Sequence, residues 1–568
     1  MEEQMKWQEY YPMVVVPGAE LNLEEDLKTY NSVFLEAAHT TIARTPLMAY
    51  YATKYWGHGM SYGSICLSLP TCRGWVYKHH KGGVYIVPHI VRDEEEIRQR
   101  EVEFKKRMRP WFERFDDLWE DRKKELIEGF EEIKSLDMDN ATPSEIYFWH
   151  YRQRMRYARM WEIHMEVLQV CFSSYLLLGE VTRERFGMST TNPEFQKLMK
   201  GFDNKVFQVL KDLWDFGERA SKEGLKPIFQ ENDAKEIIPR LEETEAGKKW
   251  VEDFMKFLEA DGWWTTEQME FNALFWLEDP SIPIGVIKEN IKRGAEFNIS
   301  QLREKQAKER KAATESLLEK VSEDERQYFS EMIKLAGKAS QLSEEHVYYC
   351  EYRYHSVLRY QFLKLANRLV KAGTMDDPED IFLLNPEEIE SVIVVPEAND
   401  LRPLLNARRA LYKEWLKKPR DPVFTTRSGM EEAAQEDLLP SLDAVIISSA
   451  IGELPEVKPE LKADIYGVCG AGGETEGIAR VILDYEDLDQ IQKGEILVTT
   501  STDSNWTPVF SIIKGIITDK AGVLSHAAIV AREFGLPAVV NTFVATEKIK
   551  TGQRVRILAD KGSVYLLD

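Results

Sequence analysis

The sequence contains little of what would mark a secreted or membrane protein. Only five of its 568 residues are cysteine and none of them forms a CxxC pair, so the sequence favours neither a disulfide framework nor a zinc site. No run approaches the roughly 20 apolar residues that a membrane span needs. The N-terminus lacks the basic and apolar regions of a signal peptide. We therefore expect a cytoplasmic protein without a membrane partner.

Positive charge is also in short supply. Lysine and arginine number 74 against 96 aspartate and glutamate, which gives a formal net charge of −22. Nucleic acids and anionic membranes bind basic surfaces, so the charge argues against both as partners. The highly charged segment 301–320 is typical of a solvated helix face. The sequence contains no P-loop motif, GxxxxGK[ST].

Residues 93–416 have the apolar spacing of α-helices almost throughout, whereas residues 74–87 alternate like a β-hairpin. Thr142 and Asn192 each precede a proline and are predicted helix caps. The expected helices are 23–55 (interrupted at Pro46), 94–134 as one helix or a pair, 142–178, 192–220, 233–258, 300–335 and 344–372.

The composition changes after residue 416. A Pro-rich polar stretch reads as a linker, and short β-type runs follow it at 443–447, 464–468, 479–483, 495–498, 538–540, 554–558 and 563–567. The sequence therefore predicts a multidomain protein: a mostly α-helical domain over 1–416, a linker over 417–436, and a C-terminal α/β domain (β/β/α) over 437–568.

The stretch 515–537, GIITDKAGVLSHAAIVAREFGLP, carries the clearest chemical signal. It predicts a buried strand, a turn, and a helix that starts near Ser525 and stops at Gly535 and Pro537. His526 then lies in the first helical turn, where unpaired N–H groups and the helix dipole favour an anion. A histidine there either caps the helix or carries a phosphoryl group on its nucleophilic nitrogen.

The same residues resemble a known family. Ser525-His526-Ala527-Ala528, followed by Ile-x-Ala-Arg-Glu and Gly-x-Pro-Ala-Val, is similar to the phosphohistidine (swivelling) domain of enzymes that use phosphoenolpyruvate or ATP through a phosphohistidine. Ala521 departs from the usual glycine. Leu524 stands where pyruvate-phosphate dikinases carry threonine, and it resembles the branch of rifampin phosphotransferase and phenylphosphate synthase. Within the C-terminal domain the resemblance is nearly continuous and includes 470–481 and 494–510. In the helical part it covers 44–47, 343–373, 376–384 and 402–409.

The resemblance implies a role for several residues. His526 would be the catalytic phosphoryl carrier, with Thr518 as hydrogen-bond partner of the imidazole. Ser525 would either cap the helix or contact the phosphate, and Arg532 would either neutralise phosphate charge or pair with an acid. The residues expected to support the phosphate are Thr518, Gly522, Ser525 and Arg532.

The resemblance also implies partners. Residues 1–420 contain nothing like the ATP-grasp domain of these enzymes, and no phosphoenolpyruvate barrel follows. As in phenylphosphate synthase, ATP and Mg²⁺ would then be bound by a separate ATP-grasp subunit, and this chain would bind no cofactor tightly and no metal. The acceptor would be an organic hydroxyl compound, a phenol. The alternatives are another acceptor, such as an antibiotic or an alcohol, and a non-enzymatic phosphohistidine relay or scaffold.

The acceptor site is predicted in the helical part, on helices 146–178 and 344–371. A transfer to a hydroxyl needs a base and a phosphate-binding cation. Regular helical spacing would place His346 and Arg353 on one face. Each candidate also suits a salt-bridged or surface role, and Trp75, Tyr77, Trp149 and Trp161 suit either a pocket or the core. The candidates are His79, His80, His346, Arg353, His355 and Arg359.

Overall fold

The computed structural model describes residues 19–30, 32–36, 42–190, 192–267, 269–294, 299–417, 423–425, 459–483, 485–502, 504–520, 522–523 and 525–567. Its contacts divide the chain into two compact units. Unit 1 comprises residues 1–170, 268–273 and 349–447, and unit 2 comprises 171–267, 274–348 and 448–568. Most of the predicted linker and the whole predicted strand 443–447 lie outside the described residues, so the domain boundaries stay a prediction.

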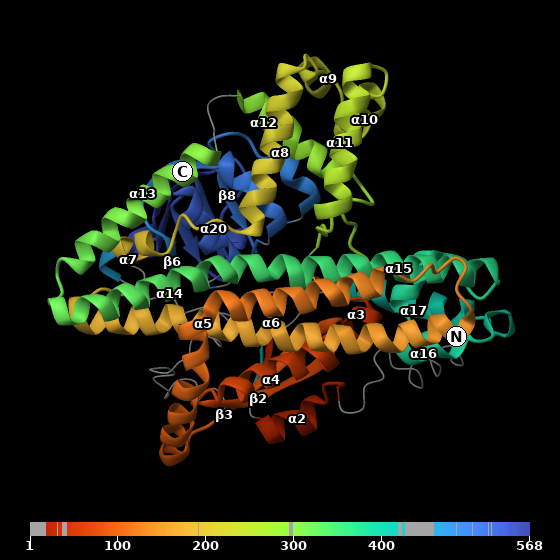
Figure 1. The fold of residues 1–568 in the computed structure, drawn as a ribbon, viewed down its shortest axis with the longest axis horizontal. Coiled ribbons are helices and arrows are strands. Elements are labelled where there is room, and N and C mark those ends of the chain that lie inside the picture. Colours follow the sequence, from red (N-terminus) through yellow and green to blue (C-terminus); the bar gives the residue numbers. More distant parts are fainter. Residues whose placement is uncertain are drawn as a thin grey trace. The chain divides into compact units, whose positions relative to one another are not determined.

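Unit 1 combines long helices with a small antiparallel sheet (Figure 1). The sheet has the order β2-β3-β1-β4, and the predicted hairpin is confirmed as β2 and β3. The helices are α2 (Leu23–Tyr30), α3 (Pro46–Tyr51), α4 (Gly57–Leu67), α5 (Glu94–Lys134), the first part of α6 (Pro143–Phe186), α15 (Arg353–Lys371), α16 (Pro386–Ile393) and α17 (Arg402–Leu416); the strands are β1 (Ser32–Leu35), β2 (Cys72–His80), β3 (Gly83–Ile90) and β4 (Val423–Thr425).

Local signals explain most boundaries in unit 1. Thr142 caps α6: its hydroxyl oxygen accepts a hydrogen bond from the Glu145 N–H at 3.3 Å, and its own N–H donates to the Glu145 carboxylate at 2.7 Å. Helix α5 forms as predicted, with a kink at Arg114. The prediction that residues 23–55 are helical was wrong for 32–35. These residues form β1 because they pair with β3, with Phe34 opposite Ile86, a partner that local sequence does not reveal.

A buried ion pair anchors the segment 268–273 in unit 1. The side chains of Arg44 and Glu270 are both fully buried, with Nη1 and Oε2 3.8 Å apart. The Glu270 carboxylate also accepts hydrogen bonds from the Thr45 hydroxyl at 2.7 Å and from the Phe271 N–H at 2.8 Å. The carboxylate is therefore well satisfied, as a buried charge must be.

Unit 2 begins with shorter helices, and several predicted helices are broken here. The helix predicted over 192–220 ends early and restarts, because Gly201 adopts φ +77° and Asn204 caps the next helix. Likewise Thr244 and Ser322 start new helices within predicted ones. The helices are the second part of α6, α7 (Pro193–Leu198), α8 (Lys205–Lys222), α9 (Lys226–Glu231), α10 (Ala234–Leu241), α11 (Glu245–Asp261), α12 (Ser281–Arg293), α13 (Ile299–Leu318) and α14 (Glu323–Val347).

The C-terminal part of unit 2 is an eight-stranded sheet with the order β5-β12-β11-β7-β8-β9-β10-β6. Alternate residues of its central strands enter two different hydrophobic clusters, one on each face, as the period of two requires. The elements are β5 (Ile465–Tyr466), β6 (Val468–Ala471), β7 (Glu474–Val481), β8 (Ile496–Thr499), β9 (Gly515–Thr518), α20 (His526–Phe534), β10 (Ala538–Val540), α21 (Ala545–Lys548), β11 (Arg554–Leu558) and β12 (Ser563–Leu566).

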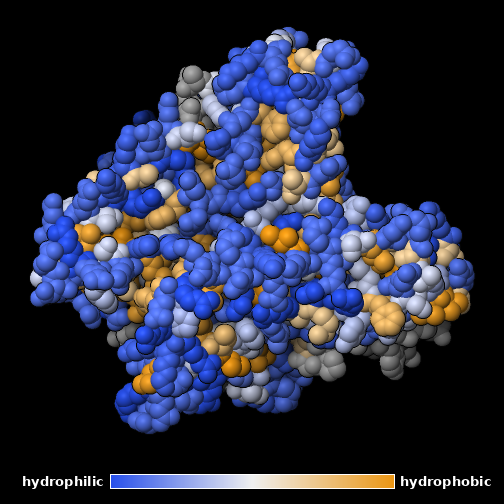
Figure 2. All heavy atoms as spheres, viewed as in Figure 1, coloured by the Kyte–Doolittle hydropathy of each residue, from blue (hydrophilic) through white to orange (hydrophobic). Residues whose placement is uncertain are grey.

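The predicted fold class is confirmed in outline: the chain combines helical regions with a C-terminal β-rich domain. The face of the molecule drawn in Figure 2 is largely hydrophilic, in keeping with the charge of the chain. Among the described helices, none combines the length and the apolar character that crossing a bilayer would take.

The Arg44–Glu270 pair gives a test of the fold. Replacing Glu270 by alanine leaves a buried guanidinium without this carboxylate, so we expect the free energy of unfolding to fall by about 3–5 kcal/mol. Equilibrium urea denaturation followed by circular dichroism measures the change. Glu103→Ala is the control, since Glu103 forms an exposed ion pair with Lys106 whose loss costs at most about 1 kcal/mol. Equal losses in both variants would contradict the anchoring role.

Candidate active site

The sheet places His526 at the start of a helix. Strand β9 pairs in parallel with both β8 and β10, and a turn leads from its end to α20. Ser525 is the N-cap: its backbone is extended and its hydroxyl accepts a hydrogen bond from the Ala528 N–H at 3.4 Å. His526 is therefore the first helical residue, as predicted. The helix ends at Gly535, with φ +69°, which confirms the predicted stop.

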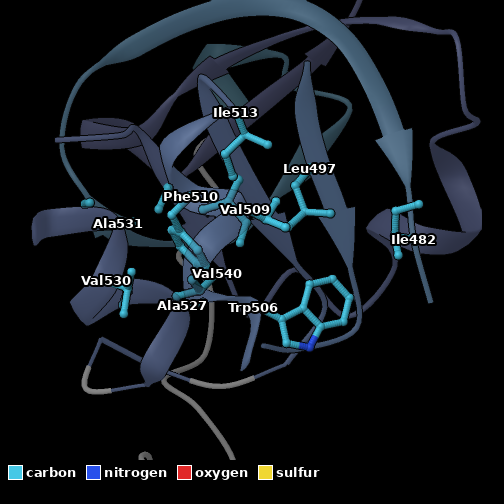
Figure 3. Close-up of a cluster of buried hydrophobic side chains, with 14 of the residues drawn as sticks. Ile482, Leu497, Trp506, Val509, Phe510, Ile513, Ala527, Val530, Ala531 and Val540 are labelled. Atoms are coloured by element: carbon cyan, nitrogen blue, oxygen red, sulfur yellow. The ribbon is translucent and has the colours of Figure 1, made fainter. Parts of the chain in front are cut away.

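Apolar packing fixes α20 against the sheet (Figure 3). Ala527, Val530 and Ala531 belong to a buried cluster that also contains Phe510 and Val540. Small residues on the helix allow a close approach to the strands. Because the cluster holds the helix along most of its length, the orientation of the first turn is fixed before any ligand binds.

The imidazole of His526 is partly exposed and has two defined neighbours. The Thr502 hydroxyl lies 3.1 Å from Nδ1, and the Phe510 ring meets the imidazole edge-on at a centroid distance of 5.9 Å. Packing around the ring desolvates it and lowers its pKa to about 3, because desolvation disfavours the charged form. The imidazole is therefore neutral at pH 7. When Nδ1 carries the proton and donates it to Thr502, the lone pair lies on Nε2.

Of the predicted supporting residues, Thr518, Gly522 and Ser525 have contacts in this turn, whereas Arg532 lies near the other end of α20. The Thr518 hydroxyl donates to the Lys520 carbonyl at 2.9 Å, so here the imidazole bond comes from Thr502. The Gly522 carbonyl accepts a hydrogen bond from the Ser525 N–H at 3.0 Å. Arg532 is buried and donates to the Gly470 carbonyl at 3.2 Å.

Two residues that the sequence analysis did not assign also shape the site. Thr502 lies in a segment whose likeness to the family was noted, and that likeness was the only available signal. Asp519 follows β9 and is buried. Its carboxylate accepts hydrogen bonds from the Thr542 hydroxyl and the Thr546 N–H, both at 3.1 Å, which fixes the turn before His526.

The acceptor candidates in β2 have structural contacts. His79 is buried, and its Nε2 accepts a hydrogen bond from the Gly82 N–H at 3.0 Å within the hairpin turn. The ring of His80 is partly buried and meets the ring of Tyr85 at 6.3 Å. These contacts suit a hairpin and do not identify an acceptor.

The candidates on α15 also contact the core of unit 1. His355 is fully buried, with Nε2 2.9 Å from the Tyr157 hydroxyl. Arg359 is buried and forms an ion pair with Glu379 at 2.7 Å. The Arg353 guanidinium lies on the Phe130 ring, 3.8 Å from its centroid.

His346 belongs to unit 2, where its Nδ1 lies 2.8 Å from the Leu342 carbonyl and burial lowers its pKa to about 4. The predicted shared face of His346 and Arg353 assumed regular α-helical spacing. A π-helical stretch, Tyr348–Tyr352, lies between them, so that spacing does not apply.

A pocket of about 500 Å³ opens in unit 1 where α5 ends and α6 begins. Its apolar lining includes the ring of Phe148, which is 65% exposed, and Trp149, whose indole N–H donates to the Ile133 carbonyl at 3.1 Å. Its charged lining includes Arg156, whose Nε donates to the Glu132 carboxylate at 2.6 Å. The pocket thus presents aromatic surface beside paired charges, a combination found in small-molecule sites.

Two family models match this chain. The model described as "PEP-utilising enzyme, mobile domain" matches residues 491–562, which include the whole of α20. The model described as "Rifampicin phosphotransferase fourth domain" matches residues 164–344.

Curated relatives agree with these matches. The chain is 25% identical over 377 residues to the uncharacterized phosphotransferase YvkC of Bacillus subtilis, which covers 66% of this chain and 44% of that protein. It is 29% identical over 336 residues to rifampicin phosphotransferase of Bacillus subtilis (58% and 36%). It is 45% identical over 108 residues to phosphoenolpyruvate synthase of Aquifex aeolicus (19% and 13%). The chain therefore spans less than half the length of each of these relatives.

The likeness of the motif around His526 thus agrees with matches over two separate regions. The recognised resemblance is therefore supported: the chain is similar to PEP-utilising enzymes over their mobile domain and to rifampicin phosphotransferases over a second region.

Proposed function

We propose that this chain is a phosphotransferase that carries a phosphoryl group on His526 and delivers it to an organic hydroxyl compound. The observation that carries the proposal is the position of His526 at the first residue of α20, in the region matched by the mobile-domain model. A neutral nitrogen is the nucleophile that phosphoryl transfer needs. The helix N-terminus favours the phosphate that results.

The chemistry proceeds in two displacements. In the first, an imidazole nitrogen of His526 attacks the donor phosphorus, a P–N bond forms, and the donor P–O bond breaks. In the second, the acceptor oxygen attacks the phosphohistidine, the P–N bond breaks, and the hydroxyl proton passes to a base or to water. The donor in this proposal is ATP, bound with Mg²⁺ on a separate ATP-grasp subunit.

For the acceptor we propose a phenol, bound in the pocket at the turn between α5 and α6. The exposed ring of Phe148 and the indole of Trp149 supply flat apolar surface for an aromatic ring. Arg152 and Arg156 line the same pocket, where both pair with Glu132, and an aryl phosphate product would have to compete with that carboxylate for them. By contrast, His79, His355 and Arg359 are buried in contacts that a substrate would have to break.

Two alternatives differ from this proposal in what they bind. A phosphotransferase for an antibiotic or an alcohol would use His526 in the same way but would not bind phenol. A non-enzymatic relay or scaffold would carry phosphate on His526 and need no pocket at all. Binding and exchange measurements with several hydroxyl compounds distinguish the three.

Isotope exchange tests the proposed function directly. The chain is incubated with phenyl phosphate and isotopically labelled phenol, without ATP. We expect label to enter phenyl phosphate, because the phosphohistidine forms reversibly. His526→Ala should abolish the exchange, and His58→Ala, which changes an exposed histidine outside the mobile domain, should retain it.

Exchange that survives in His526→Ala would contradict the phosphohistidine mechanism. Exchange with an alcohol but not with phenol would favour the alternative acceptor. Incubation of the chain alone with ATP labelled in its β and γ phosphates tests the donor. Label on His526 without a second subunit would contradict a separate ATP-grasp subunit.

The lowered pKa of His526 gives a pH prediction. Diethyl pyrocarbonate modifies neutral imidazole, so the modification rate of His526 should stay constant from pH 8 to 5, whereas that of N-acetylhistidine falls with a midpoint near about 6.5. Peptide mass spectrometry measures the rate. Between about pH 6.5 and pH 3 the His526 imidazole is protonated in the unfolded chain but not in the native one. The free energy of unfolding should therefore fall as the pH drops through this interval. A midpoint near 6.5 for His526 would contradict the desolvated imidazole.

The acceptor pocket is tested by phenol binding, measured by calorimetry. Phe148→Ala removes a pocket ring and should weaken phenol binding by about twofold to tenfold, the range for one aromatic contact. Tyr147→Ala is the matched control, because Tyr147 is also exposed on α6 but does not line the pocket. Equal affinity in the two variants would place the phenol elsewhere.

A further inference from the structure

Within unit 2, the end of α20 opposite His526 makes a buried ionic contact. Glu533 lies in the region matched by the mobile-domain model, and its side chain is only 6% exposed. Its Oε2 accepts hydrogen bonds from the Arg303 guanidinium of α13 at 2.7 Å and from the Gly201 N–H at 2.9 Å. Arg303 and Gly201 both lie in the segment matched by the fourth-domain model, so this contact joins the two matched regions.

Further contacts surround this ion pair. The rings of Phe534 and Phe207 stack at a centroid distance of 6.0 Å, and the Arg303 guanidinium lies 4.1 Å from the centroid of the same Phe207 ring. Directly after β6, the edge strand of the C-terminal sheet, the Gly472 N–H donates to the Gln196 side-chain oxygen of α7 at 3.1 Å. In Figure 1, α7 and α13 lie beside the C-terminal sheet. We call this set of contacts the junction. It joins Glu533, Phe534 and Gly472 to residues of the segment 164–344, and its described contacts are polar and aromatic.

The position of Glu533 on α20 relates this junction to the reactive residue. Seven residues separate His526 from Glu533, which corresponds to about two helical turns and a separation of about 10 Å along the axis. At about 100° per residue the two side chains leave the helix in nearly the same direction. The partner surface that holds Glu533 therefore lies along the face of α20 that carries His526.

Burial makes the charge pair dependent on both partners. Desolvation raises the pKa of the Glu533 carboxyl, an effect that Arg303 and the Gly201 N–H oppose. A carboxylate buried in this way loses its compensation when its cationic partner is removed. The contact is consequently strong while Glu533 and Arg303 are both in place, and it weakens when either side chain is removed.

We propose that Glu533 and Arg303 form a latch that docks the mobile domain on the fourth domain and positions the His526 face of α20, and that this latch opens when the domain leaves to collect a phosphoryl group. The departure rests on the proposed function, whereas the docking itself does not. Glu533 and Arg303 are positioning residues, since neither touches the reacting atoms.

Hydrogen exchange of the full-length chain, followed by mass spectrometry, tests the latch without donor or acceptor. The Gly201 and Gly472 amides donate across the junction, so peptides that contain them report docking. We expect Glu533→Ala and Arg303→Ala each to accelerate exchange in both peptides at least tenfold. Peptides covering β8 and β9 should be unaffected. Lys308→Ala, also on α13 but in an exposed ion pair with Glu304, is the control and should change none of them.

The double variant tests the pairing itself. If the two side chains act through each other, Glu533→Ala combined with Arg303→Ala should exchange no faster than either single variant. Additive effects would overturn the pairing, and unchanged protection of the Gly472 peptide in Glu533→Ala would overturn the docking. Lost protection in β8 and β9 would also overturn the latch, because Glu533 would then stabilise the mobile domain itself. His526→Ala should retain full protection of the Gly201 and Gly472 peptides, because His526 is not part of the ion pair. The latch is therefore tested independently of the proposed phosphotransfer.

Discussion

The desolvated imidazole at the first residue of α20 is the constraint on which the rest of the C-terminal domain depends. A phosphoryl carrier has to be neutral when it attacks and has to hold a dianionic group afterwards. Burial of the ring lowers its pKa and so favours the neutral form, and the helix N-terminus supplies the positive potential. The parallel strands β8, β9 and β10 serve both needs, because they fix the turn from which the helix starts.

A carrier also has to move, which limits how it is held. Within the mobile domain, α20 is fixed by a large apolar cluster that is costly to open. Its contact with the segment matched by the fourth-domain model is different in kind: it includes an ion pair, an aromatic stack and hydrogen bonds from backbone N–H groups to side chains. Apolar burial therefore maintains the internal geometry of the site, while specific polar contacts determine where the domain rests. Polar contacts suit this second role, since water can replace them when they separate.

Local sequence was sufficient for the secondary structure around His526 but not for the contacts of its side chain or for all of the fold. The strand, the cap at Ser525, His526 and the stop at Gly535 follow one another within about twenty residues, so propensity and capping rules predict them. The break at Gly201 was missed, because a glycine inside a helical pattern does not reveal its φ. Strand β1 and the Thr502 hydroxyl bond depend on partners 52 and 24 residues away, which no local pattern specifies.

The histidines and arginines predicted as acceptor-site residues on the helices show that residue type alone does not distinguish a ligand site from a core contact. Histidine and arginine were chosen because they can act as bases and bind phosphate, yet the same polarity lets them satisfy a helical core. His355 contacts Tyr157, and Arg359 contacts Glu379, in positions closed to solvent. A ligand instead needs surface that the fold leaves uncovered, and an exposed ring costs hydrophobic free energy that a bound aromatic compound recovers. For this reason the proposed acceptor pocket is built on the exposed face of Phe148 and not on the buried histidines.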